Sequence, residues 1–119
     1  MDKPHRNLEV WSMSMDLAQE IYTLTDSFPV SEKFGIVSQM RRSAVSIPSN
    51  IAEGAARGSA VDYARFLTIS LASLSELDTQ LELSRRLAFC SSIQTESIEA
   101  KMGSVSRMLV SLRKRLRST

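Results

Sequence analysis

Apolar residues recur every three or four positions along almost the whole chain, and this spacing constrains the fold more than any other feature. It is clearest near the C-terminus, at positions 98, 102, 105, 109, 112 and 116. Side chains at such intervals share one face of an α-helix. No long stretch alternates apolar and polar residues as a half-buried strand does, and no Asn-Gly or Asp-Gly hairpin pair occurs. We therefore expect an all-α fold.

Interruptions of the pattern divide the chain into four predicted helices, over residues 8–27, 32–57, 60–88 and 93–116. Asn7, Ser31 and Ser59 are the expected N-caps of the first three. Ser91 and Gln94 have the spacing of a capping box before the fourth. Because short connections make successive helices antiparallel, we expect an up-down-up-down four-helix bundle. The 119 residues suffice for one such domain, which we place over the whole chain.

The segment SIPSNIAEGAARGS, residues 46–59, contains residues that are costly inside a helix. Pro48 lacks an N–H, and its ring crowds the carbonyl of residue 44, so it should kink or end a helix. The apolar steps from Ala44 through Ile47 to Ile51 nevertheless keep their phase across it. The pattern therefore predicts one long second helix that is kinked at Pro48.

Two interpretations of the polar residues in this segment stay open. In the first, Asn50 and Glu53 satisfy backbone groups freed by the kink, and Gly54 lets two helices pack closely. In the second, a polar row forms a groove for phosphate or for a partner. That row consists of Arg42, Ser46, Asn50 or Ser49, Glu53 and Arg57.

The net charge is only +2, but the basic residues are unevenly placed. From Arg107 onward there are five basic residues and no acidic one, which suggests either an anionic partner or cations that complement the end of a helix. Guanidinium groups match phosphate bidentately, so arginines near the polar row are the other candidates. The candidate phosphate-binding residues are Arg41, Arg42, Arg57, Arg65, Arg113, Lys114, Arg115 and Arg117.

Signatures of known enzyme classes do not occur. The single histidine, His5, and the single cysteine, Cys90, cannot supply the usual zinc or di-iron ligand sets. There is no Walker A sequence, and no serine stands in a nucleophile elbow. We therefore expect no enzymatic activity, no catalytic residue, no metal and no cofactor.

The expected location is the cytoplasm. No run of eighteen apolar residues occurs, and the N-terminus lacks the apolar core of a signal peptide. The lone Cys90 offers no disulfide framework and fits a reduced thiol. We expect no membrane partner.

Four stretches resemble the four-helix-bundle proteins encoded in intervening sequences of bacterial large-subunit (23S) ribosomal RNA genes. They are LEVWSMSMDLAQEIYTLTDSFP, EKFGIVSQMRRSAVSIPSNIAEGAARGS, YARFLTISLASLSELDTQLELS and SRMLVSLRKRL. The SIPSNIAEG stretch is the most distinctive and follows the family pattern position by position. The chain departs from that pattern where Ala88 replaces the usual glycine of the turn before the last helix.

The resemblance implies a closed bundle that assembles into a homopentamer. A related branch, the accessory variability determinant proteins of diversity-generating retroelements, binds nucleic acid and a reverse transcriptase. The family implies no catalytic residue. Five copies, each with a charge of +2, would together carry +10 and repeat every arginine cluster around a ring.

Two functional hypotheses follow. The first is a non-enzymatic oligomeric bundle that binds RNA or DNA through the phosphate backbone. The few aromatic residues, mostly on apolar faces, argue against single-strand stacking and favour weak sequence specificity. The alternative is an adaptor or assembly ring whose partner is a protein.

Overall fold

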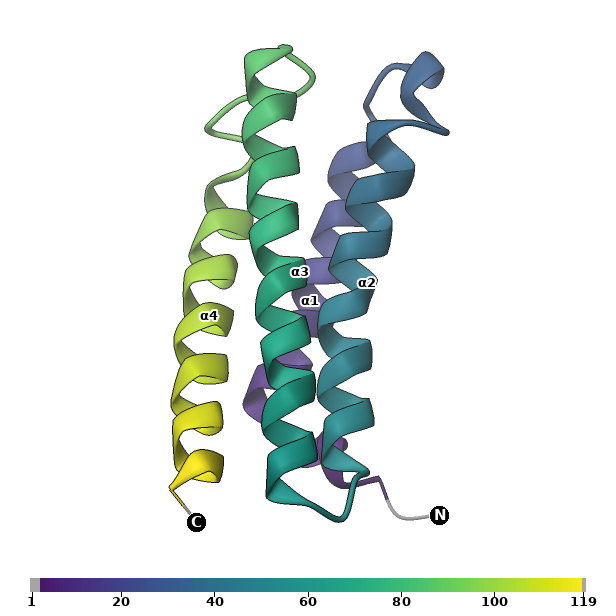
Figure 1. Ribbon diagram of the computed structural model, residues 1–119. Helices are drawn as coiled ribbons and strands as arrows, with labels where there is room; N and C mark the ends of the chain where they lie inside the picture. Colours follow the sequence, from purple (N-terminus) through teal and green to yellow (C-terminus); the bar gives the residue numbers. More distant parts are fainter. Residues whose placement is uncertain (1–2, 119) are drawn as a thin grey trace.

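The computed structural model describes residues 3–118, which form four α-helices and no strand (Figure 1). The helices are α1 (Glu9–Thr25), α2 (Ile36–Ala55), α3 (Ala60–Arg86) and α4 (Glu96–Arg117). Short 3-10 turns, η1 (Pro4–Asn7) and η2 (Val30–Glu32), precede α1 and α2. Successive helices run in opposite directions within a body of 46 × 26 × 20 Å. The structure therefore confirms the all-α, up-down-up-down four-helix bundle.

Each helix contributes fully buried apolar side chains to one core. They are Leu17 and Ile21 on α1, Met40, Ile47 and Ile51 on α2, Leu67, Leu77 and Leu81 on α3, and Val105 and Leu109 on α4. Burying one such side chain stabilises the fold by about 1.5–3 kcal/mol. The core thus follows the three-and-four spacing of the sequence.

The first two predicted N-caps are wrong. Successive i→i+3 bonds begin at Lys3, so Asn7 lies inside a 3-10 turn and α1 begins at Glu9. Ser31 lies inside the second such turn, where Glu32 N–H donates to the Pro29 carbonyl, so α2 begins only at Ile36. In both places a proline starts a tight turn that the apolar spacing alone does not reveal.

The other two capping predictions are confirmed. Ser59 Oγ accepts a hydrogen bond from the Asp62 N–H at 3.2 Å. Ser91 and Gln94 form the two reciprocal bonds of a capping box, at 2.8 and 3.2 Å. This box closes a turn ahead of the last helix, which begins at Glu96 and not at 93.

The second helix continues unbroken through Pro48, as predicted, whereas the kink itself stays a prediction. Two neighbouring carbonyls accept side-chain donors. Asn50 Nδ2 donates to the Ser46 carbonyl at 2.8 Å, and Ser70 Oγ on α3 donates to the Ile47 carbonyl at 2.9 Å. Pro48 has no N–H, so the carbonyl that loses its helical donor is that of Ala44, and neither of these bonds reaches it. The role that the structural interpretation expected for Asn50 at a freed backbone group therefore stays a prediction.

Glu53 has a different role from the one in that interpretation. It is exposed, and its carboxylate accepts a bond from the Arg57 guanidinium at 2.7 Å. An exposed pair of this kind contributes about 0–1 kcal/mol, so Glu53 has little influence on the helix.

Gly54 allows α2 and α3 to pack closely, as predicted. A Cβ at this buried position would lie 2.9 Å from Phe66 Cβ and 3.2 Å from the Tyr63 carbonyl oxygen. Real Cβ atoms do not approach other carbon atoms so closely. The small residue is therefore required by the spacing of the two helices.

Ala88 adopts the left-handed conformation, with φ of 62°, at the end of α3. The Phe89 N–H donates to the Ser84 carbonyl at 2.9 Å and the Ala88 N–H to the Arg85 carbonyl at 3.0 Å. This is the Schellman arrangement, in which glycine is the usual residue. The turn therefore keeps the geometry of a glycine turn although it contains alanine.

Replacing Ala88 by Gly should raise the free energy of unfolding by about 1 kcal/mol, because the left-handed conformation strains alanine but not glycine. The measurement is denaturant unfolding of both proteins. Ala72→Gly is the matched control, on the exposed side of α3, and should lower stability by about 1 kcal/mol. Loss of stability in both variants would contradict the assigned strain at Ala88.

Gly54→Ala should lower the free energy of unfolding by about 1–3 kcal/mol, because the added methyl group forces α2 and α3 apart. Gly103→Ala is the control, since a Cβ there meets only the flexible end of Arg107 at 3.3 Å. It should instead stabilise α4 by up to about 1 kcal/mol. Equal effects in thermal unfolding would show that the α2–α3 spacing tolerates a side chain.

Candidate nucleic-acid interface

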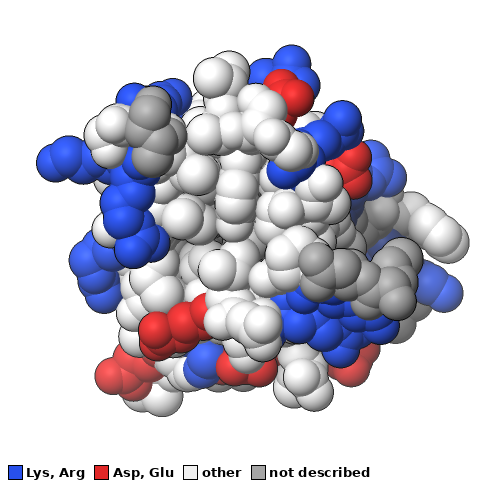
Figure 2. Space-filling model, turned by 90° about the horizontal axis from the view of Figure 1, so that it is seen from below, with Lys and Arg blue, Asp and Glu red and all other residues white. Residues whose placement is uncertain are grey.

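The eight candidate phosphate-binding residues separate into two groups. Six lie at the end of the bundle where α2 meets α3 and α4 terminates, which we call the basic end. Figure 2 looks onto this end and shows Lys and Arg side chains, with Asp and Glu side chains between some of them, around a largely uncharged centre. The other two, Arg41 and Arg42, lie about 20 Å away along α2. The residues of the basic end are Arg57, Arg65, Arg113, Lys114, Arg115 and Arg117.

Antiparallel packing of the start of α3 against the end of α4 brings distant arginines together. Arg113 donates to Thr68 Oγ1 at 3.2 Å. Arg65 and Arg117 both line a hollow of about 490 Å³ between the two helices. Burial raises the pKa of Tyr63, and the positive charge of Arg115 opposes this rise. Three cations, Arg65, Arg113 and Arg117, thus lie along the α3–α4 surface although about fifty positions separate the two segments. Arg115 instead borders a hollow between α1 and α4, together with Glu9.

Arg57 and Arg65 flank the ring of Phe66, with Cζ atoms 4.9 and 5.6 Å from its centroid. Each also has an acidic neighbour, Glu53 at 2.7 Å and Asp62 at 3.4 Å respectively. All four side chains of these pairs are exposed, so the pairs contribute little to stability. A phosphate group can therefore compete for both guanidinium groups.

The structure is compatible with both interpretations of the C-terminal cations, namely contact with an anionic partner and stabilisation of the helix end. Lys114, Arg115 and Arg117 stand in the last turn of α4, where positive charge complements the helix macrodipole. None of the three forms an ion pair within residues 3–118. They can therefore complement the helix end and still contact an anion.

Arg41 joins α1 to α2. Its Nε donates to Thr25 Oγ1 at 2.9 Å, and its Nη2 contacts Asp26 Oδ1 at 2.9 Å and the Tyr22 carbonyl at 3.3 Å. The guanidinium also lies over the Tyr22 ring, 4.5 Å from its centroid. With 29% of its side chain exposed, Arg41 is first a structural contact between helices.

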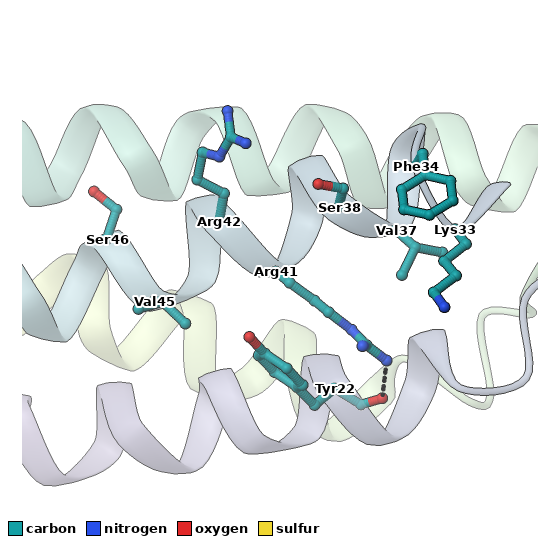
Figure 3. A pocket seen from close by; sticks show the side chains of 9 residues that line it. All are labelled: Tyr22, Lys33, Phe34, Val37, Ser38, Arg41, Arg42, Val45 and Ser46. Atoms are coloured by element: carbon teal, nitrogen blue, oxygen red, sulfur yellow. Dashed lines mark hydrogen bonds between the residues drawn. The ribbon is translucent and has the colours of Figure 1, made fainter.

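Arg42 is exposed and forms no ion pair in the described part of the chain. It borders a hollow of about 630 Å³, drawn in Figure 3, together with Lys33 and the rings of Tyr22 and Phe34. The sequence prediction missed Lys33 and Phe34. The available signal was the apolar Phe34 in EKFG, which stands outside the helical repeat.

A second hollow of about 600 Å³ lies beside it between α1 and α2 and is mainly apolar. Met15, Tyr22 and Val45 expose 45%, 42% and 42% of their surfaces there. Trp11 also lines it, and its ring meets His5 edge-on at 4.9 Å. The exposed apolar side chains of Met15, Tyr22 and Val45 therefore lie at the surface of the bundle, above the buried Ala18.

Two other kinds of feature do not occur within residues 3–118. No three metal-ligating side chains come together there. No helix in the same range is long and apolar enough to cross a membrane.

Comparison with known proteins identifies the family. A family model described as 23S rRNA-intervening sequence protein matches residues 6–111. No curated protein matches the chain. A solved structure of a protein of unknown function, from the S23 ribosomal protein family of Bacteroides thetaiotaomicron VPI-5482, is 29% identical with a TM-score of 0.79. The match covers 88% of this chain and 98% of that one. These findings confirm the resemblance seen in the sequence, and the chain belongs to the family of 23S rRNA-intervening sequence proteins.

Proposed function

We propose that this protein is a non-enzymatic nucleic-acid-binding protein that contacts the phosphate backbone through its basic end. The observation that carries the proposal is the gathering of six cations from three segments at one end, with only two of them in ion pairs within residues 3–118. Both pairs are exposed, so a polyanion can replace the carboxylates at little cost. The family name, 23S rRNA-intervening sequence protein, supports RNA as the first ligand to test.

Binding at this end would have little sequence specificity. Arginine and lysine contacts to phosphate position a nucleic acid but do not read its bases. Two aromatic rings at the basic end, Tyr63 and Phe66, are half-buried against α2, and Arg57 and Arg65 lie over the Phe66 ring. The geometry therefore favours recognition by charge and shape.

We also propose that the protein forms a homo-oligomer, a homopentamer by its family resemblance, and that it works in the cytoplasm. Trp11, Met15, Tyr22 and Val45 form an apolar surface with the aromatic and methionine content of protein interfaces. We assign a second copy of this chain to that surface. Closed rings repeat each cation cluster, so weak phosphate contacts would add through multivalency.

The alternative is an adaptor whose partner is another protein. The apolar surface of Trp11, Met15, Tyr22 and Val45 also favours an adaptor. If copies of this chain assemble through other faces, this surface stays free for a different protein. A partner that stays bound after nuclease treatment would support this alternative. The relation to accessory variability proteins stays a prediction.

Replacing Arg117 by Glu should weaken binding of a structured RNA and of a duplex DNA to a similar extent. Affinity should fall log-linearly with salt, and the slope for the variant should be smaller by about 0.7–0.9 for each phosphate that the protein no longer neutralises. The control is Arg86→Glu, which makes the same charge change at the far end of α3, where the side chain is 75% exposed. If both variants lose the same affinity, the loss reports only the change in net charge, which would contradict a localised binding site.

Met15→Glu should reduce the mass of the protein in solution, because it places a charge on the apolar surface assigned to a second copy. Light scattering after size-exclusion chromatography measures this mass. Ile93→Glu is the control, since Ile93 is 82% exposed in the α3–α4 connection. An unchanged oligomer in Met15→Glu, or a monomeric wild type, would refute the assigned contact.

A further inference from the structure

The hollow of Figure 3 differs in chemistry from the basic end and lies about 20 Å from it along α2. Its walls are Tyr22 on α1, the segment just before α2, and the first turns of α2. Its volume of about 630 Å³ falls in the range of small-ligand sites. The side chains that line it indicate which ligand it would recognise.

The charge of the hollow favours an anion. Lys33, Arg41 and Arg42 line it, and no lining residue is acidic. Asp26 balances Arg41 from outside at 2.9 Å, whereas Lys33 and Arg42 have no carboxylate partner within residues 3–118. Two positive charges without a carboxylate partner therefore border this space, and Figure 3 shows their side chains extending in opposite directions.

The aromatic side chains favour a flat ring. Phe34 is 90% exposed and makes no contribution to the core. Lys33 Nζ lies 5.5 Å from its ring centroid. The Tyr22 ring is not free in the same way, because Arg41 lies over it and its exposed part belongs to the apolar surface assigned to a second copy. Exposed aromatic faces beside cations are the platforms on which proteins stack unpaired bases.

The ring precedes α2, and the cation lies on its second turn. Ser38 and Arg42 are one helical turn apart on α2, Phe34 lies in the turn before the helix, and Figure 3 shows Ser38 between the other two. The Ser38 hydroxyl has no hydrogen-bond partner in the described part of the chain. A phosphate between Arg42 and Ser38 would receive both guanidinium and hydroxyl donors.

We propose that this hollow binds one unpaired nucleotide, with its phosphate on Arg42 and Ser38 and its base against Phe34. Inorganic phosphate alone would not use the ring, and an uncharged aromatic ligand would not use the two free cations. The nucleotide can be a free mononucleotide or part of a single strand. The site is separate from the basic end, so it can exist whether or not the basic end binds nucleic acid.

The test is calorimetric titration of the full chain with adenosine monophosphate, adenosine, inorganic phosphate and a single strand of eight adenylates. Adenosine monophosphate should bind more tightly than adenosine or inorganic phosphate. Phe34→Ala should weaken its binding about tenfold or more, the effect of removing one base–aromatic stack. Arg42→Gln should weaken it to a similar degree.

Two controls separate this proposal from others. Ile93→Ala and Arg86→Gln remove an exposed apolar residue and an exposed cation elsewhere, and both should leave nucleotide affinity unchanged. Arg117→Glu should also leave it unchanged while it weakens duplex binding. Failure of the basic-end proposal is therefore distinguishable from failure of this one.

The outcomes show whether the nucleotide is free or part of a strand, and whether the proposal holds. If the single strand binds and depends on Phe34 and Arg42 while the mononucleotide binds weakly, the nucleotide comes from a strand. If neither ligand binds, or if Phe34→Ala and Arg42→Gln bind both as wild type does, the proposal is overturned. It is also overturned if Phe34→Ala abolishes oligomer formation and no nucleotide binds, because the ring would then contact another copy.

Discussion

The close approach of α2 and α3 is the constraint on which the remaining structure depends. Gly54 lies against Phe66 and Tyr63, and no side chain fits between the helices there. Farther along, Ser46 and Ser73 share a hydrogen bond of 2.8 Å. Small residues let the helices interlock along their length, and hydroxyl groups satisfy one another inside the contact.

This contact also brings a side-chain donor of α3 to the turn that contains Pro48. Proline removes one backbone donor, and its ring disturbs the preceding turn. The Ser70 hydroxyl reaches across from α3 to the Ile47 carbonyl, and Asn50 reaches back to Ser46. Donors from the neighbouring helix and from the same helix thus bind carbonyls in the turn before proline, although neither reaches the Ala44 carbonyl whose helical donor is missing.

The architecture was predictable from the sequence because it depends on a repeated property. Spacing by three and four appears many times in each helix, so single exceptions do not change the result. The N-caps predicted at Asn7 and Ser31 were wrong because each depends on one local competition, which a 3-10 turn won. The turn at Ala88 was also difficult to predict from local sequence. Its left-handed conformation is accompanied by the backbone hydrogen bonds of Phe89 and Ala88, although the residue is not glycine.

The candidate site was harder to predict because residues of the same type have different roles in the structure. Arg41 and Arg42 are neighbours in sequence, yet about 100° separates their directions on a helix. One turns to α1 and is held by Thr25 and Asp26, and the other remains exposed beside Phe34. Arg85 repeats the first case, since it joins Glu82 and Glu99 across α3 and α4 with 19% of its side chain exposed.

The arginines of this bundle therefore form two groups, according to whether a neighbouring helix provides a hydrogen-bond acceptor for them. Those that face a carboxylate or hydroxyl on another helix are partly buried and stabilise the packing. Arg42 and the basic-end arginines other than Arg113 face solvent, and their carboxylate partners are exposed or absent within the described residues. Arg113 combines the two cases, since it is half-buried and donates to Thr68 on α3. A net charge of +2 conceals this division, because paired and free cations count equally in the sum. The surface available to a polyanion is set by pairing geometry, and only the fold specifies that geometry.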